Sequence, residues 1–295
     1  MAKITFEPIK EKVGACVHVA KQDMTDPEVA KAILEELEKR GVLVFPQLGL
    51  NDEEQLAVTD ALGDRVNFTK TAPGGNAAAQ DVYKITLDKD VNDHPEYVLG
   101  TFFWHVDGVT IDQPMPKATL LSARKLSPWG GQTEFANLYA AYDALPEEEK
   151  EAFAGLRVLH SIGASVRDVV PVVNTETVAL LNVADDMAHP LVWTHPDGRK
   201  SLLVGTTTDH IEGLSLAHGR AILRRLAEWA AQPDFSYCHQ WQPGDFVIWD
   251  NCGVMHRVRP YAEDSGRTMH RTTLAGSERI AGSEKVEKGK SLAAA

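Results

Sequence analysis

The chain has 295 residues, of which 43% are hydrophobic and 24% charged, a composition typical of a water-soluble globular protein that can bury a substantial core. Its 42 acidic residues outnumber its 30 basic residues, and the formal net charge of −12 argues against DNA, RNA or an anionic membrane surface as a partner. Residues 1–18 contain no long apolar run, so we expect neither a signal peptide nor a membrane-spanning segment.

The cysteine content indicates a reducing compartment. The chain has three cysteines, Cys16, Cys238 and Cys252, and no Cys-x-x-Cys pair. Disulfide frameworks need paired cysteines and an oxidising compartment, so we expect reduced thiols and a cytoplasmic protein. The sequence leaves open whether the chain forms a homo-oligomer.

Helical signals dominate the start of the chain. The stretch TDPEVAKAILEELEKRG (25–41) offers a capping residue, a proline in the first turn and a terminating glycine. Val29, Ile33 and Leu37 recur every four residues and predict a buried stripe. The further elements predicted in chain order are a buried strand at 42–46 and helices at 52–63, at 137–155 with an interruption near Pro146, and at 216–232.

The second half of the chain carries strand signals. Residues 189–195 and 200–205 flank the turn PDGR, which predicts a hairpin. Residues 235–241 and 246–251 flank the turn QPGD and predict a second strand pair. Strands joined by tight turns argue against a doubly wound parallel sheet, so we predict a mainly β fold with flanking helices, an antiparallel barrel or jelly roll.

The stretch GTFFWHVDGVT (100–110) places a histidine and an aspartate two residues apart. On an extended strand His105 and Asp107 would point to the same side, as two ligands of one metal ion must. Such a pair is weak evidence by itself, because the chain contains a second one, His195 and Asp197. That second pair lies in the predicted hairpin turn, where a structural role is expected.

A third metal-capable residue, His256, follows the strand that ends in WDN. Arg267 lies eleven residues beyond it and Arg271 four residues further. Two histidines and one carboxylate occupy one face of an octahedral metal and leave three positions open, which suits Fe(II) and O2 chemistry, whereas structural zinc wants four closed ligands. Taken one at a time, each of these residues is more often a structural residue.

Together these motifs resemble the Fe(II)/2-oxoglutarate-dependent dioxygenases of the taurine dioxygenase and 2,4-dichlorophenoxyacetate dioxygenase type. The resemblance rests on HVD, the distant WDNxxxxH and the two arginines, and it extends to 130–146 and 189–205, so that it covers about residues 14–275. It implies a double-stranded β-helix, and an oxidative reaction that turns 2-oxoglutarate and O2 into succinate and CO2 while a C–H bond is hydroxylated.

The resemblance also implies roles for individual residues. The implied ligands of Fe(II) are His105, Asp107 and His256. Arg267 matches the arginine that pairs with the distal carboxylate of 2-oxoglutarate, and Thr133 matches the threonine that hydrogen-bonds it. Arg271 matches a second arginine, which contacts an anionic group of the substrate in several members. Cys252 lies near His256 in sequence, and we expect it to point away from the metal because it would otherwise be oxidised.

Residues 1–280 are expected to form a single domain. The Gly-rich segment 71–80 and the valine-rich segment 161–188 are predicted to act as lids over the site, although the valines could equally pack on the barrel. The polar end at 281–295 is expected to be a disordered tail or an appended remnant outside the fold.

The expected substrate is a small organic acid with an apolar body, an aryl- or alkyl-carboxylate such as an aryloxyalkanoate. Valines of the lid and Phe102 and Phe103 beside the metal pair favour this interpretation, and Phe103 is a predicted substrate contact. A sulfonate or alkyl sulfate, or an uncharged substrate of a tailoring hydroxylase of secondary metabolism, remains open. A more distant alternative is a binding protein that holds metal and 2-oxo acid without turnover.

Overall fold

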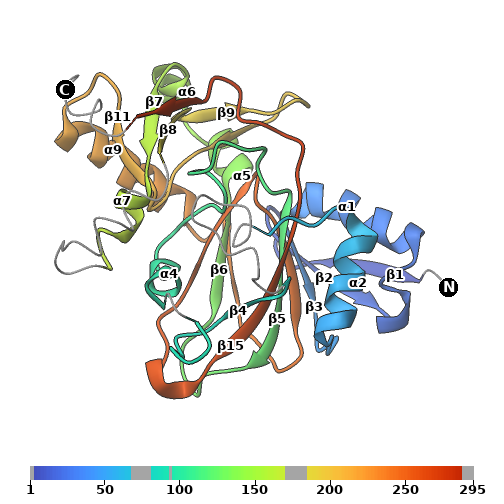
Figure 1. Ribbon diagram of the computed structural model, residues 1–295. Helices are drawn as coiled ribbons and strands as arrows, with labels where there is room; N and C mark the ends of the chain where they lie inside the picture. Colours follow the sequence, from blue (N-terminus) through green and yellow to red (C-terminus); the bar gives the residue numbers. More distant parts are fainter. Residues whose placement is uncertain (1–2, 68–80, 93–94, 170–184, 288–295) are drawn as a thin grey trace.

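A large and a small β-sheet face each other at the centre of the protein and form a jelly roll (Figure 1). The computed structural model describes residues 3–67, 81–92, 95–169 and 185–287. In sheet order, the strands of the large sheet are β1 (Ile4–Pro8), β2 (Ala15–Val19), β3 (Val42–Phe45), β13 (Phe246–Asp250), β5 (Ala118–Lys125), β15 (Thr268–Leu274) and β4 (Tyr83–Ile85). Those of the small sheet are β12 (Ser236–His239), β6 (Thr133–Asn137) and β14 (Val254–Val258). The predicted fold class is confirmed.

Strand β13 contributes side chains to two hydrophobic clusters, one on each face of the large sheet. All five of its residues are buried, and its side chains alternate between the two faces of the large sheet. Val247 and Trp249 pack between the sheets, whereas Phe246 and Ile248 face the helices outside. A central strand that is covered on both faces needs such an unbroken apolar run.

Two helices cover the outer face of the large sheet, as Figure 1 shows: α1 (Pro27–Arg40) and α2 (Asp52–Leu62). Asp26 caps α1 by accepting the backbone N–H groups of Glu28 and Val29, and Gly41 ends it with a left-handed φ of 70°. The predicted stripe of Val29, Ile33 and Leu37 is buried, at no more than 1% exposure. The predicted first helix is therefore confirmed.

A third group of elements packs against one end of the jelly roll. Its four-stranded sheet contains, in order, β11 (Thr208–Ile211), β7 (Arg157–His160), β8 (Asp186–Pro190) and β16 (Glu284–Val286). The predicted hairpin is confirmed as β9 (Val192–Thr194) paired with β10 (Lys200–Leu202). The remaining helical elements are α4 (Pro95–Gly100), α5 (Leu138–Asp143), α6 (Glu147–Phe153), α7 (Ile162–Val166), α9 (Leu216–Ala230), and the short 3-10 turns Lys21–Asp23 and Glu263–Ser265. The break between α5 and α6 lies at Pro146, as predicted.

The second predicted strand pair is wrong. β12 and β13 do not pair with each other: β12 pairs with β6, and β13 pairs with β3 and β5. The turn between them carries the chain from the small sheet to the large one. Asp245 holds this turn, since its carboxylate accepts the backbone N–H groups of Gln47 and Gln242 and contacts the His239 ring at 3.0 Å. A sequence shows that a turn exists but does not show which sheet receives the strand after it.

The expected disordered tail needs correction. Residues 284–286 form β16, which pairs with β8 through Val286 and Asp186, Lys285 and Met187, and Glu284 and Ala188. This strand is short and polar, so its pairing could not be recognised from hydrophobic pattern. Residues 288–295 lie outside the described part of the chain, as does the predicted lid at 71–80. Of the second predicted lid, 161–188, the described ends contain α7 and part of β8, and the rest lies outside.

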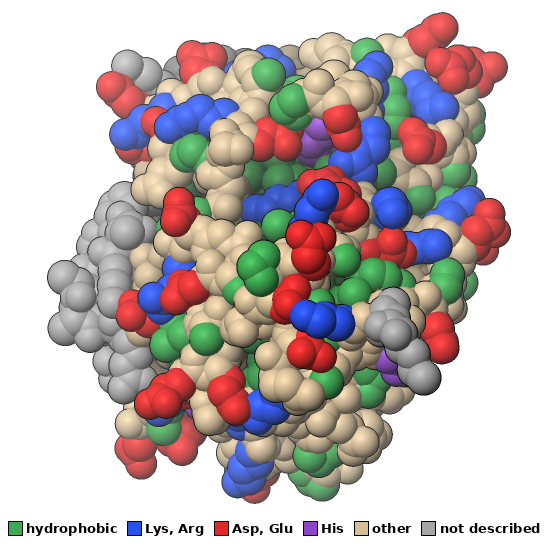
Figure 2. All heavy atoms as spheres, turned by 90° about the vertical axis from the view of Figure 1, so that its right-hand side faces the viewer, with side chains coloured by type: hydrophobic (Ala, Val, Ile, Leu, Met, Phe, Trp, Pro, Cys, Tyr) green, Lys and Arg blue, Asp and Glu red, His purple; other side chains and the backbone are tan. Residues whose placement is uncertain are grey.

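No helix among the described residues is long and apolar enough to cross a membrane. On the face seen in Figure 2, acidic and basic side chains are interspersed.

Candidate active site

The backbone brings the two candidate histidines together inside the jelly roll. His256 lies in the middle of β14, and an isolated antiparallel bridge joins it to His105. Each donates its backbone N–H to the carbonyl of the other, at 3.0 and 2.9 Å. The centroids of their rings lie 4.1 Å apart. The stretch around His105 forms no regular strand beyond this bridge, so the predicted extended strand is replaced by a single pair of hydrogen bonds.

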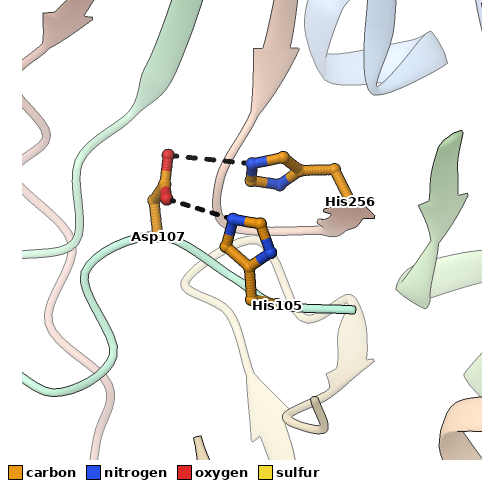
Figure 3. A group of neighbouring side chains, drawn as sticks. All are labelled: His105, Asp107 and His256. Carbon is orange, nitrogen blue, oxygen red and sulfur yellow. Dashed lines mark ion pairs between the residues drawn. The ribbon is translucent and has the colours of Figure 1, made fainter. Parts of the chain in front are cut away.

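Asp107 completes the group from the turn that follows. The metal-capable atoms of His105, Asp107 and His256 lie within 4.8 Å of one another (Figure 3). His105 Nε2 is 3.8 Å from Asp107 Oδ1, and His256 Nε2 is 4.0 Å from Asp107 Oδ2. Gly108 shapes this turn with a φ of 91°, and a Cβ there would lie 2.5 Å from the ring of Pro116, so only glycine fits without displacement.

The protonation states of this group suit a divalent cation. Burial alone would raise the pKa of Asp107, but His256, Arg271 and His105 outweigh it and hold this pKa at about 2. Burial, followed by the neighbouring His105, lowers the pKa of His256 to about 3, so its ring is neutral at neutral pH. His105 Nδ1 lies 2.8 Å from the Phe103 carbonyl, which fixes the tautomer that leaves Nε2 without a proton. One carboxylate and two imidazoles converge on one point, and this donor set fits Fe(II).

A buried arginine lies near one end of β6. Arg267 is 3% exposed and donates from Nη2 to the Gly131 carbonyl at 3.1 Å, while its guanidinium lies 4.8 Å from the Tyr261 ring. Its Nε is buried without a hydrogen-bond partner, and no carboxylate of the described residues pairs with it. Burial lowers the pKa of Arg267, which shows how unfavourable this charge is without an anion.

Thr133 lies two residues beyond Gly131, at the start of β6. Its Oγ1 accepts a hydrogen bond from Trp241 Nε1 at 2.9 Å, and the side chain is buried. A Cβ at Gly131 would lie 2.8 Å from Arg267 Nε, so glycine makes room for the guanidinium beside this strand. Thr133 and Arg267 thus flank the same short backbone stretch.

Arg271 lies on β15, close to the candidate ligand Asp107. Its Nη1 is 3.9 Å from Asp107 Oδ2, and its guanidinium carbon is 5.0 Å from the Tyr83 ring. Tyr83 is its direct partner across β15 and β4. Arg271 therefore faces the ligand group, whereas Arg267 precedes β15 and reaches toward Gly131.

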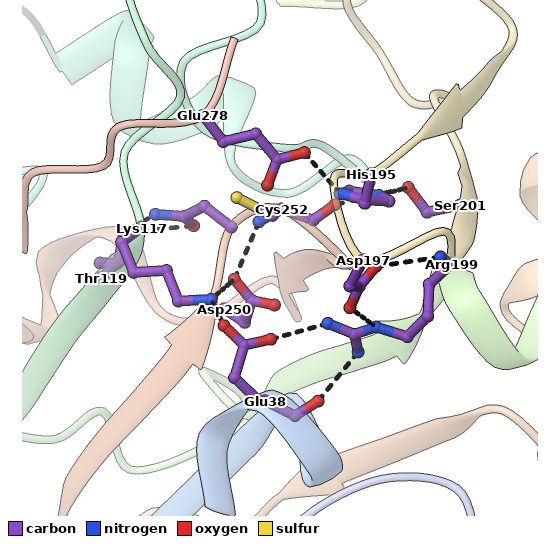
Figure 4. A network of polar contacts seen from close by, with 11 residues as sticks. Glu38, Lys117, Thr119, His195, Asp197, Arg199, Ser201, Asp250, Cys252 and Glu278 are labelled. Carbon is purple, nitrogen blue, oxygen red and sulfur yellow. Dashed lines mark hydrogen bonds and ion pairs between the residues drawn. The ribbon is translucent and has the colours of Figure 1, made fainter. Parts of the chain in front are cut away.

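The structure keeps the second His-x-Asp pair away from the ligand group, as predicted. His195 is buried, with Nδ1 2.8 Å from Glu278 Oε1 and Nε2 2.8 Å from Ser201 Oγ. Asp197 accepts a hydrogen bond from the backbone N–H of Arg199 within the hairpin turn. It also forms an ion pair with the Arg199 side chain (Figure 4). Both residues line a cavity of about 690 Å³ that contains none of the three candidate ligands.

The sequence also predicts that Cys252 points away from the metal and that Phe103 contacts the substrate. Cys252 is buried in an apolar cluster with Met255, and its thiol neighbours Asp250 and Lys117 rather than the candidate ligands, in line with expectation. Burial raises the pKa of this thiol well above its usual range, which keeps it protonated. Phe103 contributes its carbonyl to His105, and the role of its side chain in substrate binding stays a prediction.

Sequence reasoning missed two residues that are hydrogen-bonded, directly or through one another, to the candidate ligand Asp107. Thr119 of β5 donates its hydroxyl to Asp107 Oδ2 at 2.9 Å, and Asn251 Nδ2 donates to Thr119 Oγ1 at 3.0 Å. Asn251 belongs to the WDN stretch, but nothing in that pattern assigned it a partner. Thr119 lies in an apolar run that indicates only a buried strand, so no local signal pointed to it.

Comparisons with known proteins place this chain among dioxygenases. The chain is 34% identical over 275 residues to the alpha-ketoglutarate-dependent 2,4-dichlorophenoxyacetate dioxygenase of Burkholderia sp. (strain RASC), covering 90% of this chain and 91% of the relative. It is 32% identical to an (S)-phenoxypropionate/alpha-ketoglutarate-dioxygenase of Sphingobium herbicidovorans (80% and 82% covered), and 29% identical to an alkylsulfatase of Acinetobacter baylyi (85% and 78% covered).

A solved structure and a family model extend the comparison to the fold. The crystal structure of AAD-2 in complex with Mn(II) and N-oxalylglycine superposes with a TM-score of 0.77 at 31% identity, covering 94% of this chain and 99% of that one. The model of the family "Taurine catabolism dioxygenase TauD, TfdA family" matches residues 5–273. Because that match spans nearly the whole chain and coincides with the His105, Asp107 and His256 group, the protein belongs to the TauD/TfdA family of dioxygenases.

Proposed function

We propose that this enzyme is an Fe(II)- and 2-oxoglutarate-dependent dioxygenase that hydroxylates a small organic acid with an apolar body, an aryl- or alkyl-carboxylate such as an aryloxyalkanoate. The reaction consumes O2 and releases succinate and CO2. The observation that carries the proposal is one arrangement: a three-residue ligand group with one arginine facing it and a second arginine buried without a carboxylate partner in the described part of the chain.

The metal centre is assigned to His105, Asp107 and His256. When bound there, Fe(II) would supply the activation of O2 and a chelating site for the 2-oxo acid. The protein's part is to bring the three donors to one point, and the low pKa values of Asp107 and His256 leave those two side chains deprotonated at neutral pH. Two aromatic rings, of Trp249 and Phe135, pack around His256 and restrict its rotation.

The cosubstrate site is assigned to Arg267 and Thr133. A guanidinium donates two parallel charge-assisted hydrogen bonds to a carboxylate, and the unpaired Nε of Arg267 is available for such a bond. An incoming dianion would neutralise a charge that the surrounding protein leaves uncompensated. The Tyr261 ring against the guanidinium holds it in position before the acid arrives.

Substrate binding is assigned to Arg271 and the neighbouring Phe103. Arg271 is a quarter exposed and held between Asp107 and the Tyr83 ring, so its remaining N–H groups can receive the carboxylate of a second acid close to the metal ligands. The relatives with the names 2,4-dichlorophenoxyacetate and (S)-phenoxypropionate dioxygenase act on acids of this kind, which supports the choice of substrate class.

A sulfonate or alkyl sulfate is the second candidate substrate, because Arg271 would bind those anions equally well and an alkylsulfatase is among the relatives. The uncharged substrate of a tailoring hydroxylase would leave Arg271 without a function in binding. A binding protein without turnover would not need a metal site with open positions.

The function is tested with the metal-reconstituted protein. Anaerobic addition of Fe(II) and 2-oxoglutarate should produce a weak visible charge-transfer band, and O2 should then release succinate. A panel of aryloxyalkanoates, alkyl sulfates, alkanesulfonates and uncharged aromatics should show the greatest stimulation with an aryloxyalkanoate. Absence of the band and of succinate would contradict the enzyme class, and stimulation by a sulfate ester alone would replace the substrate class.

We also place the enzyme in the cytoplasm, where its three free cysteines would stay reduced. A small molecule is its only proposed partner, with a homo-oligomer still open.

A further inference from the structure

We propose that Thr119 and Asn251 are positioning residues, which hold the Asp107 carboxylate in the orientation that binds the metal ion. The inference rests on the metal site of the proposed function. It adds two residues that raise the affinity of this site for the metal ion. Neither residue has been given a role in that function.

Asp107 needs such support because its own backbone does not supply it. It lies in a turn after the bridge between His105 and His256, not in a strand. Its carboxylate can rotate, and three side chains compete for it: His105 lies 3.8 Å from Oδ1, and His256 and Arg271 lie 4.0 and 3.9 Å from Oδ2. A carboxylate turned fully toward Arg271 would present its oxygens less well to a metal between the histidines.

Thr119 supplies the missing restraint from a rigid position. It is 0% exposed on β5, a strand of the large sheet that pairs on both sides, where Thr119 lies opposite Trp249 and Thr273. Its hydroxyl lies 2.9 Å from Asp107 Oδ2. Asp107 Oδ1 accepts no hydrogen bond from any residue in the described part of the chain, so it is the carboxylate oxygen that stays free for a cation.

Asn251 determines the direction of the Thr119 hydroxyl. A hydroxyl donates one hydrogen and accepts on its lone pairs. Asn251 Nδ2 donates to Thr119 Oγ1 at 3.0 Å, which leaves the hydroxyl hydrogen for Asp107; the alternative acceptor, Asn251 Oδ1, is farther away at 3.4 Å. Asn251 is itself 0% exposed, and its backbone N–H donates to the carbonyl of Lys117, the residue that precedes β5.

Asn251 therefore donates a hydrogen bond to Thr119, and Thr119 donates one to the candidate metal ligand Asp107. Figure 4 shows Thr119 at the edge of the polar network around Asp250, which precedes Asn251. Partners of this kind fix ligand orientation, and removing one typically costs about 10- to 100-fold in metal affinity or activity.

The test measures Mn(II) affinity of the metal-free protein, from the aqueous Mn(II) signal in electron paramagnetic resonance, so that it does not depend on turnover. Thr119→Val keeps the shape of the side chain and removes the hydroxyl, and it should weaken Mn(II) binding about 10- to 100-fold. Thr119→Ser restores the hydroxyl and should bind within about threefold of the wild type. Asn251→Leu should weaken binding in the same direction but less, because Thr119 can still reach Asp107.

Thr59→Val is the matched control. Thr59 is also 0% exposed, and its hydroxyl makes buried hydrogen bonds to Gln55 and Thr272, away from the metal ligands. This variant should lower the thermal unfolding midpoint without changing Mn(II) affinity. Thr119→Ala replaces Thr119→Val if the valine variant does not fold, and Asn251→Leu gives an independent result.

The outcomes separate this inference from the function on which it rests. Wild-type protein that fails to bind Mn(II) contradicts the proposed metal site itself. Wild-type protein that binds, together with folded Thr119→Val or Thr119→Ala protein of unchanged affinity, overturns the role of Thr119 alone. Equal losses in Thr119→Val and Thr119→Ser would also overturn it, because the effect would then come from packing rather than from the hydroxyl.

Discussion

His105 and His256, which lie far apart in the sequence, exchange both of their backbone hydrogen bonds, at 3.0 and 2.9 Å. These bonds join the loop before Asp107 to the middle of β14. This backbone bridge brings the two residues side by side, with their ring centroids 4.1 Å apart. Replacing either side chain leaves this bridge in place, and the first prediction follows from that.

His105→Ala, Asp107→Ala and His256→Ala should each abolish Fe(II)-dependent succinate formation while circular dichroism shows an intact fold. The metal loses one of three protein donors, and the backbone bridge does not depend on the side chains. Asp197→Ala is the control, because Asp197 belongs to the other His-x-Asp pair and its side chain is half exposed in a hairpin turn. Full activity of any of the three ligand variants, or a comparable loss with Asp197→Ala, would contradict the assignment.

Arg267→Ala should weaken 2-oxoglutarate binding by roughly a hundredfold or more. Two charge-assisted hydrogen bonds are lost, each worth about 1.5–3 kcal/mol, and about 1.4 kcal/mol corresponds to a factor of ten. Affinity is measured by titrating the anaerobic Fe(II) protein and following the charge-transfer band. Pyruvate, which lacks the distal carboxylate, should lose much less affinity, and equal losses for both acids would place that carboxylate elsewhere.

Arg271→Ala should raise the KM for a carboxylate substrate strongly and change 2-oxoglutarate affinity by less than about tenfold. Arg271 lies near Asp107 and Tyr83, whereas Arg267 contacts Gly131 and Tyr261. Because their surroundings differ, we expect the two arginines to bind different anions. Succinate formed without hydroxylated product should persist. An unchanged KM would favour an uncharged substrate and move the tailoring-hydroxylase alternative ahead.

Glu278→Gln should become progressively more stable than the wild type as the pH rises from about 5 to 8. Burial raises the pKa of Glu278 from its ordinary 4.5 to about 7, so the folded state binds its proton more tightly than the unfolded state does. The stability that this group contributes is present below pH 4.5 and is lost as the pH rises through about 7. Glutamine does not titrate, so the Glu278→Gln protein does not lose this stability as the pH rises.

His195, which contacts Glu278, makes a contribution to stability that depends on pH in the opposite direction. Burial lowers the pKa of His195 to about 4, so its contribution is present above pH 6.5 and is lost as the pH falls toward 4. The 2.8 Å contact between the two side chains could be an ion pair, but both shifts favour a neutral hydrogen bond. Thermal unfolding midpoints of the metal-free protein at several pH values test the prediction, with the exposed Glu148→Gln as control. A difference between wild type and Glu278→Gln that stays constant with pH would refute it.

Local signals in the sequence were sufficient for much of the fold and for the candidate residues. Asp26 and Gly41 mark the two ends of α1, and the turn around Asp197 marks the β9–β10 hairpin, because capping and turn formation depend on residues close in sequence. The His-x-Asp pair, the later histidine and the two arginines were also recognisable, since their residue types and spacing carry the resemblance to the family.

Only the tertiary structure decided which strands pair and what surrounds each ligand. β12 and β13 follow a tight turn yet join different sheets, and the polar β16 pairs with β8, because strand partners are chosen by packing across the whole domain. The hydroxyl of Thr119 meets Asp107 for the same reason: β5 and the loop after His105 share no local sequence signal. Hydrogen bonds between distant segments depend on the folded backbone, and a linear pattern does not contain them.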